Sequence, residues 1–274
     1  MRARLSALAA LGAVSLLALP AWAQEPAPEP VSSIPEVPAS RAEAGPIPVG
    51  YESDVYCSGW IGGVDEKFPG RIISAEKLET RASYMQGDIM YLDIGSSRGV
   101  VPGQEFWVVR PGRIVYEPGS VTKEVGRLYE TPARLKVVCV QEETSIAEIT
   151  ASCSDSTIGD LVLPFEPIPI PLARVAPLPT SCDSSSGKIQ GRIVEVFDTA
   201  TPVATDTVVY LDLGDKDGLL PGDFLTVFRP RDDVNTLRTI LGQVAILSTR
   251  EHTSVAKVVS MTDTMYVGDS VELR

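Results

Sequence analysis

The stretch Tyr91-Leu92-Asp93-Ile94-Gly95 recurs with a single change as Tyr210-Leu211-Asp212-Leu213-Gly214. Further along, Gly99-Val100-Val101-Pro102-Gly103 recurs as Gly218-Leu219-Leu220-Pro221-Gly222 at the same offset of 119 residues. Ten of the 21 positions from Tyr91 to Pro111 are identical to their counterparts at this offset. A match of this length at one fixed spacing indicates a duplicated domain.

The repeat extends beyond these blocks in both directions. Three further pairs match in the same order: Gly70-Arg71-Ile72-Ile73 with Gly191-Arg192-Ile193-Val194, Thr144-Ser145-Ile146-Ala147 with Thr253-Ser254-Val255-Ala256, and Gly159-Asp160 with Gly268-Asp269. The last two pairs have an offset of 109 residues, so the second copy is ten residues shorter than the first between its Arg-Pro and Thr-Ser blocks. We therefore predict tandem homologous domains.

Each copy has the sequence pattern of an all-β domain. Short runs rich in Val, Ile, Tyr and Phe alternate with turns that contain Gly, Pro and Asp. The strands predicted in the second copy are Arg192–Phe197, Thr207–Leu213, Phe224–Arg229, Gln243–Ser248, Val255–Met261 and Ser270–Leu273. Six short strands fit a small closed barrel better than a wide sandwich, because closure leaves no exposed sheet edge.

The N-terminus has the features of a targeting segment. Arg2 and Arg4 precede an apolar run from Leu5 to Leu19, and Ala21-Trp22-Ala23 has the small residues that signal peptidase accepts. The apolar run is shorter than the roughly 20 residues that a membrane-spanning helix needs. We predict a signal peptide over residues 1–23, no integral membrane segment after its cleavage, and a periplasmic or secreted protein.

Two Pro-rich stretches divide the remaining chain. Their composition favours extended polyproline II and cannot build a core. The predicted order is a disordered Pro/Glu-rich tail over 24–53, a first barrel over 54–163, a Pro-rich linker over 164–180 and a second barrel over 181–274. Two weak binding sites joined by such a linker are expected to gain avidity when both engage one partner.

Charge and composition restrict the classes of ligand. The chain has 274 residues, 36 acidic and 24 basic side chains, and a formal net charge of -12. Such a balance argues against nucleic acid and anionic lipid as partners, because both require clustered Lys and Arg. With one histidine in the sequence, a His-rich metal site is excluded. We predict no cofactor and no metal site.

The four cysteines are expected to serve structure. In an oxidising compartment they favour disulfides, and none forms a C-x-x-C motif. Cys57 precedes the first core strands and Cys153 lies near the end of the same domain, so we predict a Cys57–Cys153 bond. For Cys139, a buried free thiol and a bond to Cys182 both remain open.

The repeated blocks also resemble a known module. The series Val-Tyr-Leu-Asp-Leu-Gly, Asp-Gly-Leu-Leu-Pro-Gly-Asp and His-Thr-Ser-Val-Ala-Lys-Val, found between residues 209 and 258, resembles the C-terminal domain of flagellar assembly protein T. It also resembles the small barrels found beside LysM repeats in exported bacterial proteins. The resemblance covers roughly Gly70–Val162 and Gly191–Leu273. It implies SH3-like β-barrels without a catalytic centre that support envelope assemblies.

Three groups of residues invite a chemical role, and each also has a structural explanation. Asp93 and Asp212 could act as acids or bases, but an Asp at a strand end that accepts backbone N–H groups explains both. The run from Asp212 to Asp223 resembles a calcium loop, yet Leu213 occupies a ligand position and no Glu closes the loop. His252 beside Thr253-Ser254 is poorly spaced for a catalytic relay. We interpret all three as structural.

The candidate interaction residues are two arginines and two tryptophans. Arg110 and Arg229 each precede a Pro and could bind a partner carboxylate through the forked guanidinium. A structural salt bridge at the barrel rim is the alternative. Trp60 and Trp107, with Phe68, would form an anchor patch for a partner if they were exposed together, and core packing is the alternative.

The sequence thus predicts a non-enzymatic, exported envelope protein that acts as a protein-interaction or assembly module. An envelope protein is the expected partner. The alternative function is accessory binding of peptidoglycan, and a hydrolase with an unrecognised site is the third hypothesis.

Overall fold

Two closed sheets account for most strands in the computed structural model, which describes residues 47–77, 81–173, 180, 185–199, 203–231 and 237–274. The predicted signal peptide, most of the predicted tail and Cys182 lie outside these ranges. No helix in the described ranges has the length and apolar character needed to cross a bilayer.

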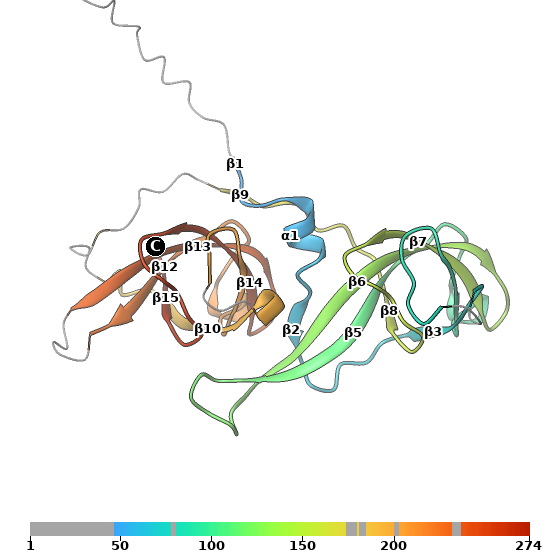
Figure 1. Cartoon of the computed structure of the whole chain (residues 1–274), viewed down its shortest axis with the longest axis horizontal. Coiled ribbons are helices and arrows are strands. Elements are labelled where there is room, and N and C mark those ends of the chain that lie inside the picture. The colour runs from blue at the N-terminus through green and yellow to red at the C-terminus, as the bar shows by residue number, and fades with distance from the viewer. Residues whose placement is uncertain (1–46, 78–80, 174–179, 181–184, 200–202, 232–236) are drawn as a thin grey trace, which may run out of the picture. The chain divides into compact units, whose positions relative to one another are not determined.

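The first barrel contains six antiparallel strands. These are β3 (Gly70–Ala75), β4 (Ile89–Leu92), β5 (Glu105–Tyr116), β6 (Glu124–Val140), β7 (Ser145–Ser152) and β8 (Leu161–Pro164), with the 3-10 turn η1 (Ser96–Arg98) after β4. Their order is β3-β4-β7-β6-β5-β8, and β8 pairs with β3 to close the barrel. The resulting sheet can be followed in Figure 1.

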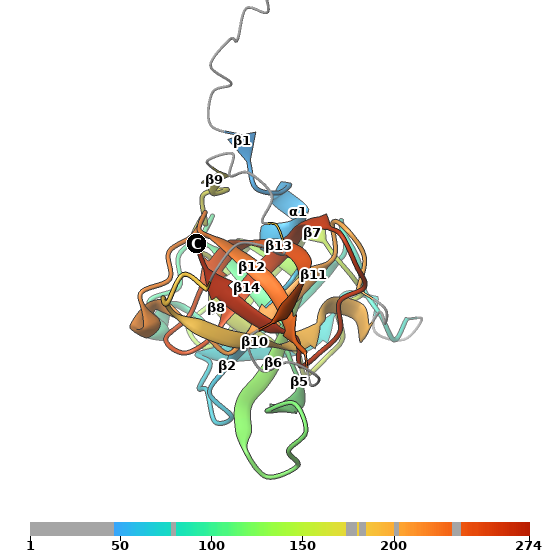
Figure 2. The same cartoon turned by 90° about the vertical axis from the view of Figure 1, so that its left-hand side faces the viewer.

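The second barrel repeats this arrangement strand for strand. It consists of β10 (Gln190–Val196), β11 (Val208–Leu211), β12 (Phe224–Pro230), β13 (Arg238–Thr249), β14 (Ser254–Met261) and β15 (Ser270–Leu273), with the 3-10 turns η2 (Phe197–Thr199) and η3 (Asp215–Asp217). The order is β10-β11-β14-β13-β12-β15, and the sheet is closed (Figure 2). All six predicted strands overlap observed ones, and the prediction of two tandem closed β-barrels is confirmed.

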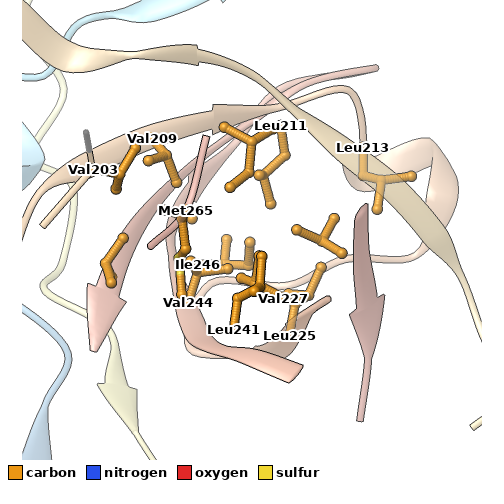
Figure 3. Close-up of a cluster of buried hydrophobic side chains, with 14 of the residues drawn as sticks. Val203, Val209, Leu211, Leu213, Leu225, Val227, Leu241, Val244, Ile246 and Met265 are labelled. Atoms are coloured by element: carbon orange, nitrogen blue, oxygen red, sulfur yellow. The ribbon is translucent and has the colours of Figure 1, made fainter. Parts of the chain in front are cut away.

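The interior of each barrel is a packed apolar core. Figure 3 shows the residues that fill the second barrel, among them Val209, Leu211, Leu225, Val227, Leu241, Val244, Ile246 and Met265, all of them almost completely buried. Inward and outward positions alternate along barrel strands, so one face of every strand contributes to this core. The first barrel has an equivalent interior that includes Ile72, Leu92, Val108 and Leu135.

A hairpin that extends from the first barrel explains the length difference between the copies. β5 and β6 have 12 and 17 residues, whereas β12 and β13 have 7 and 12. Each strand is therefore five residues longer in the first copy, which accounts for the ten extra residues. We call residues 110–129 the hairpin arm. In Figure 1 the β5–β6 ribbon extends beyond the barrel to which it belongs.

The segment before the first barrel is folded, and the linker partly covers it. α1 (Glu52–Tyr56) is followed by β2 (Trp60–Gly62), which pairs with β6 along the hairpin arm. β1 (Ile47–Pro48) pairs with β9 (Leu172–Ala173). β1 lies within the predicted tail, β9 within the predicted linker, and α1 begins in the predicted tail and ends in the predicted first barrel. Proline content alone did not reveal these pairings, because proline is tolerated in short edge strands.

A hydrophobic cluster joins the hairpin arm, α1 and β2 to the outside of the second barrel. We call it the central cluster, and its buried members include Val55, Ile61, Val115, Val194, Val208, Tyr210, Leu247 and Val255. Polar contacts reinforce it. Thr253 Oγ1 donates to the Ile61 carbonyl over 2.6 Å, and Arg113 forms an ion pair of 2.6 Å with Glu195. Residues Ala44–Arg274 accordingly form one compact unit.

The central cluster changes the expected role of the linker. The first ten linker residues, 164–173, are described, and Ile168 and Ile170 pack against the central cluster. The barrels therefore share apolar contacts in addition to the linker. The linker is thus not the only connection between the barrels, because the arm and α1 cover an apolar outer face of the second barrel. The expected gain in avidity stays a prediction.

The disulfide joins the residues that the sequence predicted. Cys57, directly after α1, is bonded to Cys153, directly after β7, with a Cα–Cα distance of 5.4 Å. This bond holds α1 against the first barrel. Cys139 is a free cysteine among the described residues, but it is exposed. The expectation of burial is wrong because its position on β6 faces away from the barrel interior.

Candidate functional site

Arg110 forms an ion pair within the first barrel. Its Nε and Nη2 donate to the two carboxylate oxygens of Asp160 over 2.9 and 2.8 Å. Asp160 also accepts the backbone N–H of Thr157, and its side chain is only 5% exposed. The hydrogen bonds that Arg110 donates to Asp160 raise the pKa of Arg110, although burial opposes the shift. This is the salt bridge that was the structural alternative for Arg110.

Arg229 repeats the same arrangement in the second barrel. Its Nε and Nη2 donate to Asp269 over 2.7 and 2.8 Å, and Asp269 also accepts the backbone N–H of Tyr266. The hydrogen bonds that Arg229 donates to Asp269 raise the pKa of Arg229. The recurring Arg-Pro and Gly-Asp blocks are therefore two halves of one bidentate ion pair. In both barrels the guanidinium fork is occupied by an internal carboxylate.

Trp60 and Trp107 are buried, with 6% and 8% of their surface exposed. They belong to an aromatic cluster with Tyr129, against which Phe68 also packs. Trp60 stacks on Tyr129 with a ring-centroid distance of 5.6 Å. The two tryptophans therefore do not form an exposed anchor patch. Most of the surface of each tryptophan is packed in the core, although both also line the pockets described below.

The remaining candidates also have structural contacts. Asp93 Oδ1 accepts the backbone N–H of Arg71 over 2.7 Å, and Asp212 Oδ1 accepts that of Arg192 over 2.5 Å. Burial raises the pKa of Asp212, and backbone hydrogen bonds oppose the shift. His252 is exposed, beside Glu251. The structure thus places the two aspartates at strand ends, as the sequence indicated.

The acidic run after β11 forms a turn. Asp215–Asp217 form η3, and Gly218 follows with a left-handed φ of 86°. Within the described residues, no three acidic, His or Cys side chains are grouped closely enough to hold a metal ion. The first copy uses η1 and Gly99 in the same positions.

A pocket of about 270 Å³ lies where α1 meets the first barrel. We call it the Arg134 pocket. The rings of Tyr56 and Trp107 and the Cys57–Cys153 disulfide form its apolar walls, and Arg134 and Ser152 are its polar lining from the barrel. The disulfide holds α1 in place, so it also fixes the shape of this pocket.

A second pocket of about 500 Å³ adjoins the first, and Tyr56 and Trp107 line both. We call it the Arg250 pocket, because the loop after β13 contributes Arg250 to its lining. The Tyr56 and Trp107 rings lie 5.3 Å apart and form the wall shared by the two pockets. Trp60 contributes a further aromatic ring.

Arg134 and Arg250 differ from the rim arginines because neither forms an ion pair within the described residues. Arg134 stacks over Phe165 at 4.8 Å, and its Nε is buried without a hydrogen-bond partner. Arg250 stacks over Trp60 at 4.4 Å. Part of the Arg250 side chain reaches solvent, but the surrounding protein removes water from the guanidinium and lowers the pKa of Arg250. Each cation is oriented by a ring and has no carboxylate in direct contact, although Glu66 partly offsets the effect of burial on Arg250.

Sequence analysis missed both arginines. Neither lies in a recurring block, and single arginines in a strand or turn have no characteristic spacing. The one available signal was a difference between the copies. The first copy alone contains Trp60, Trp107 and Phe165, and an aromatic surplus on one copy favours a binding function there.

No model of a known protein family matches the chain, and no curated protein matches it either.

Proposed function

We propose that the chain is a non-enzymatic, exported protein of the bacterial envelope that binds a protein partner. One observation carries the proposal. Arg134 and Arg250, whose guanidiniums stack on aromatic rings and form no ion pair within the described residues, line adjoining pockets with aromatic walls. Pockets that combine apolar walls with a few polar groups are typical binding sites.

The other candidate residues support binding over catalysis. Asp93, Asp212, Arg110 and Arg229 hold strand ends and barrel rims together. A general acid or base must reach a substrate proton, and carboxylates that accept backbone N–H groups or pair with arginine are poorly placed for that task. The disulfide is compatible with export, because such bonds persist in oxidising compartments.

The proposal is tested by co-purification of the tagged full chain from the native envelope after mild cross-linking. The wild type is compared with the Arg134→Gln/Arg250→Gln double variant and with Arg192→Gln, which removes the charge of an exposed arginine outside both pockets. We expect one protein to be enriched with the wild type and with Arg192→Gln, and to be lost with the double variant. No enriched protein, together with pelleting of the chain on purified peptidoglycan, would favour the alternative function.

A further inference from the structure

Two pairs of arginines in the described residues differ in their contacts. Arg110 and Arg229 each donate two hydrogen bonds to one internal carboxylate. Arg134 and Arg250 each have an aromatic ring beneath the guanidinium and form no ion pair within the described residues. Arg134 Nε is buried without a hydrogen-bond partner, and the Glu66 carboxylate acts on Arg250 electrostatically without a hydrogen bond to it. A guanidinium carries five N–H donors in a planar fork, and leaving donors of a partly dehydrated cation unpaired is unfavourable. The buried Nε of Arg134 therefore favours an external acceptor, and the exposed guanidinium of Arg250 is accessible to one.

Carboxylate is the acceptor that fits this arrangement best. A planar fork binds a carboxylate through two parallel hydrogen bonds, and stacking on an aromatic ring holds the fork in one orientation beforehand. Phe165 orients Arg134 in this way, and Trp60 orients Arg250. The partly removed water around Arg250 strengthens its attraction for an anion, because the local dielectric is lower than that of water.

The walls between the two cations are apolar. Tyr56 and Trp107 line both pockets, which together extend from the disulfide to the turn after β13. Glu52 lines the first pocket and Glu166 the second, but both are exposed and neither forms an ion pair with Arg134 or Arg250. These carboxylates disfavour a densely charged polyanion, as does the net charge of -12. A segment with separated acidic side chains and an apolar residue between them avoids this repulsion.

We propose that the adjoining pockets bind an acidic peptide segment of a protein partner. One carboxylate of the segment pairs with Arg134, a second carboxylate pairs with Arg250, and an apolar side chain between them packs on Tyr56 and Trp107. This inference rests on the proposed function and adds the chemical class of the ligand. The bound peptide is short and extended, because it has to place side chains in two adjoining pockets, one after the other.

The test uses the full chain and fluorescently labelled peptides that carry two Glu residues separated by one to five residues, with a Leu between them. Matched peptides carry Gln in place of Glu. Fluorescence anisotropy gives the dissociation constants. At least one Glu peptide is expected to bind about tenfold more tightly than its Gln counterpart, since a charge-assisted hydrogen-bonded pair is worth about that factor. Equal binding of all Glu and Gln pairs would overturn the proposal.

Variants locate the binding to the pockets. Arg134→Gln and Arg250→Gln are each expected to weaken binding of the best peptide about tenfold, and Arg192→Gln less than twofold. Arg134→Lys and Arg250→Lys retain the charge but lose the fork, so intermediate affinities are expected. A circular dichroism melt of each variant establishes that it is folded. Unchanged affinity in folded Gln variants at both positions would show that the peptide binds elsewhere and overturn the proposal.

The outcomes separate this inference from the proposed function. An envelope partner that co-purifies equally with the wild type and the double variant would leave an interaction function standing and overturn the assignment of these pockets. Pocket-dependent peptide binding without any envelope partner would support the ligand class and contradict the proposed function. Pelleting on peptidoglycan that requires both arginines, without peptide binding, would overturn the peptide assignment.

Discussion

Lys257 of β14 donates to Asp54 of α1 over 2.7 Å, although the Lys257 side chain is only 4% exposed. Asp206 forms a second ion pair with the same ammonium group, at 3.2 Å. A residue of the second barrel is thus neutralised by the helix that precedes the first barrel. This ion pair and the central cluster connect the two copies into one unit.

The first prediction concerns the titration of Lys257. Burial disfavours its charge, but the hydrogen bonds that Lys257 donates to Asp54 and Asp206 outweigh burial and raise the pKa of Lys257 above its ordinary value. A raised pKa in the folded state contributes stability that is present below the ordinary lysine pKa and is lost as the pH rises through the folded-state value. We expect Asp54→Asn to reduce the loss of stability above about pH 10. Urea unfolding of the wild type and the variant from pH 8 to 11 measures this change in stability. An equal loss of stability in both proteins at alkaline pH would contradict the role of Asp54 in raising the pKa of Lys257.

The second prediction concerns Glu272 of β15, whose side chain is 2% exposed and paired with Arg238. Burial opposes its charge, but hydrogen bonds from Ser185, Arg238 and Gln190 lower the pKa of Glu272 to about 2. The stabilisation is present above the ordinary pKa and is lost as the pH falls from about 4.5 towards 2. Glu272→Gln is expected to remove about 2 kcal/mol of this acid-dependent stability. The exposed Glu143→Gln serves as the control in unfolding measured between pH 2 and 7.

The third prediction concerns the repeated rim ion pairs. Asp160→Asn and Asp269→Asn each leave a guanidinium without its bidentate partner, so each is expected to lower the free energy of unfolding by about 2 kcal/mol. The exposed Asp65→Asn removes the same charge and is expected to change it by less than about 0.5 kcal/mol. Chemical denaturation measures all three. Equal stabilities would show that the recurring Arg and Asp do not stabilise the barrels.

The fourth prediction concerns the disulfide. Its sequence separation of 96 residues makes the reduced, unfolded chain far less restricted than the bonded one. The Cys57→Ser/Cys153→Ser variant is expected to lose about 2–4 kcal/mol of stability. Cys139→Ser changes a free, exposed cysteine and provides the matched control. A double variant as stable as the control would contradict a stabilising role for the bond.

The fifth prediction concerns the hairpin arm. Val115 is buried in the central cluster, whereas Val121 at the tip of the same hairpin is 86% exposed. Val115→Asp places a charge in the cluster and is expected to cost about 3 kcal/mol and to separate the unfolding of the two barrels into two transitions. Val121→Asp is expected to leave a single transition. Calorimetry distinguishes the two results, and a single transition in Val115→Asp would contradict coupling through the arm.

Much of the barrel architecture could be predicted from sequence because its signals are local or repeated. The strands of the second copy alternate Val, Ile and Leu with turns such as Gly218-Leu219-Leu220-Pro221-Gly222. In that turn Gly222 has a φ of 94°, a value that favours glycine. The Cys57–Cys153 bond followed from the positions of two cysteines at the ends of one domain.

The parts that sequence analysis missed depend on long-range contacts. α1 has five residues, too few to show helical periodicity, and depends on packing and the disulfide. The ten-residue difference between the copies was visible, but its division between β5 and β6 was not. Arg134 and Arg250 became candidates only when the structure showed that they stack on aromatic rings, form no ion pair within the described residues and line pockets.

The central claim is that the chain binds a protein partner through the Arg134 and Arg250 pockets. Site-specific photo-cross-linking in the native envelope tests it most directly, with the photoreactive residue placed at Glu166 beside the Arg250 pocket or, as a control, at Val121 on the hairpin tip. The account predicts one cross-linked protein from position 166, competed by the acidic peptide and absent from position 121. The account would be contradicted if both positions gave the same cross-linked proteins. It would also be contradicted if the acidic peptide did not reduce the cross-linking from position 166.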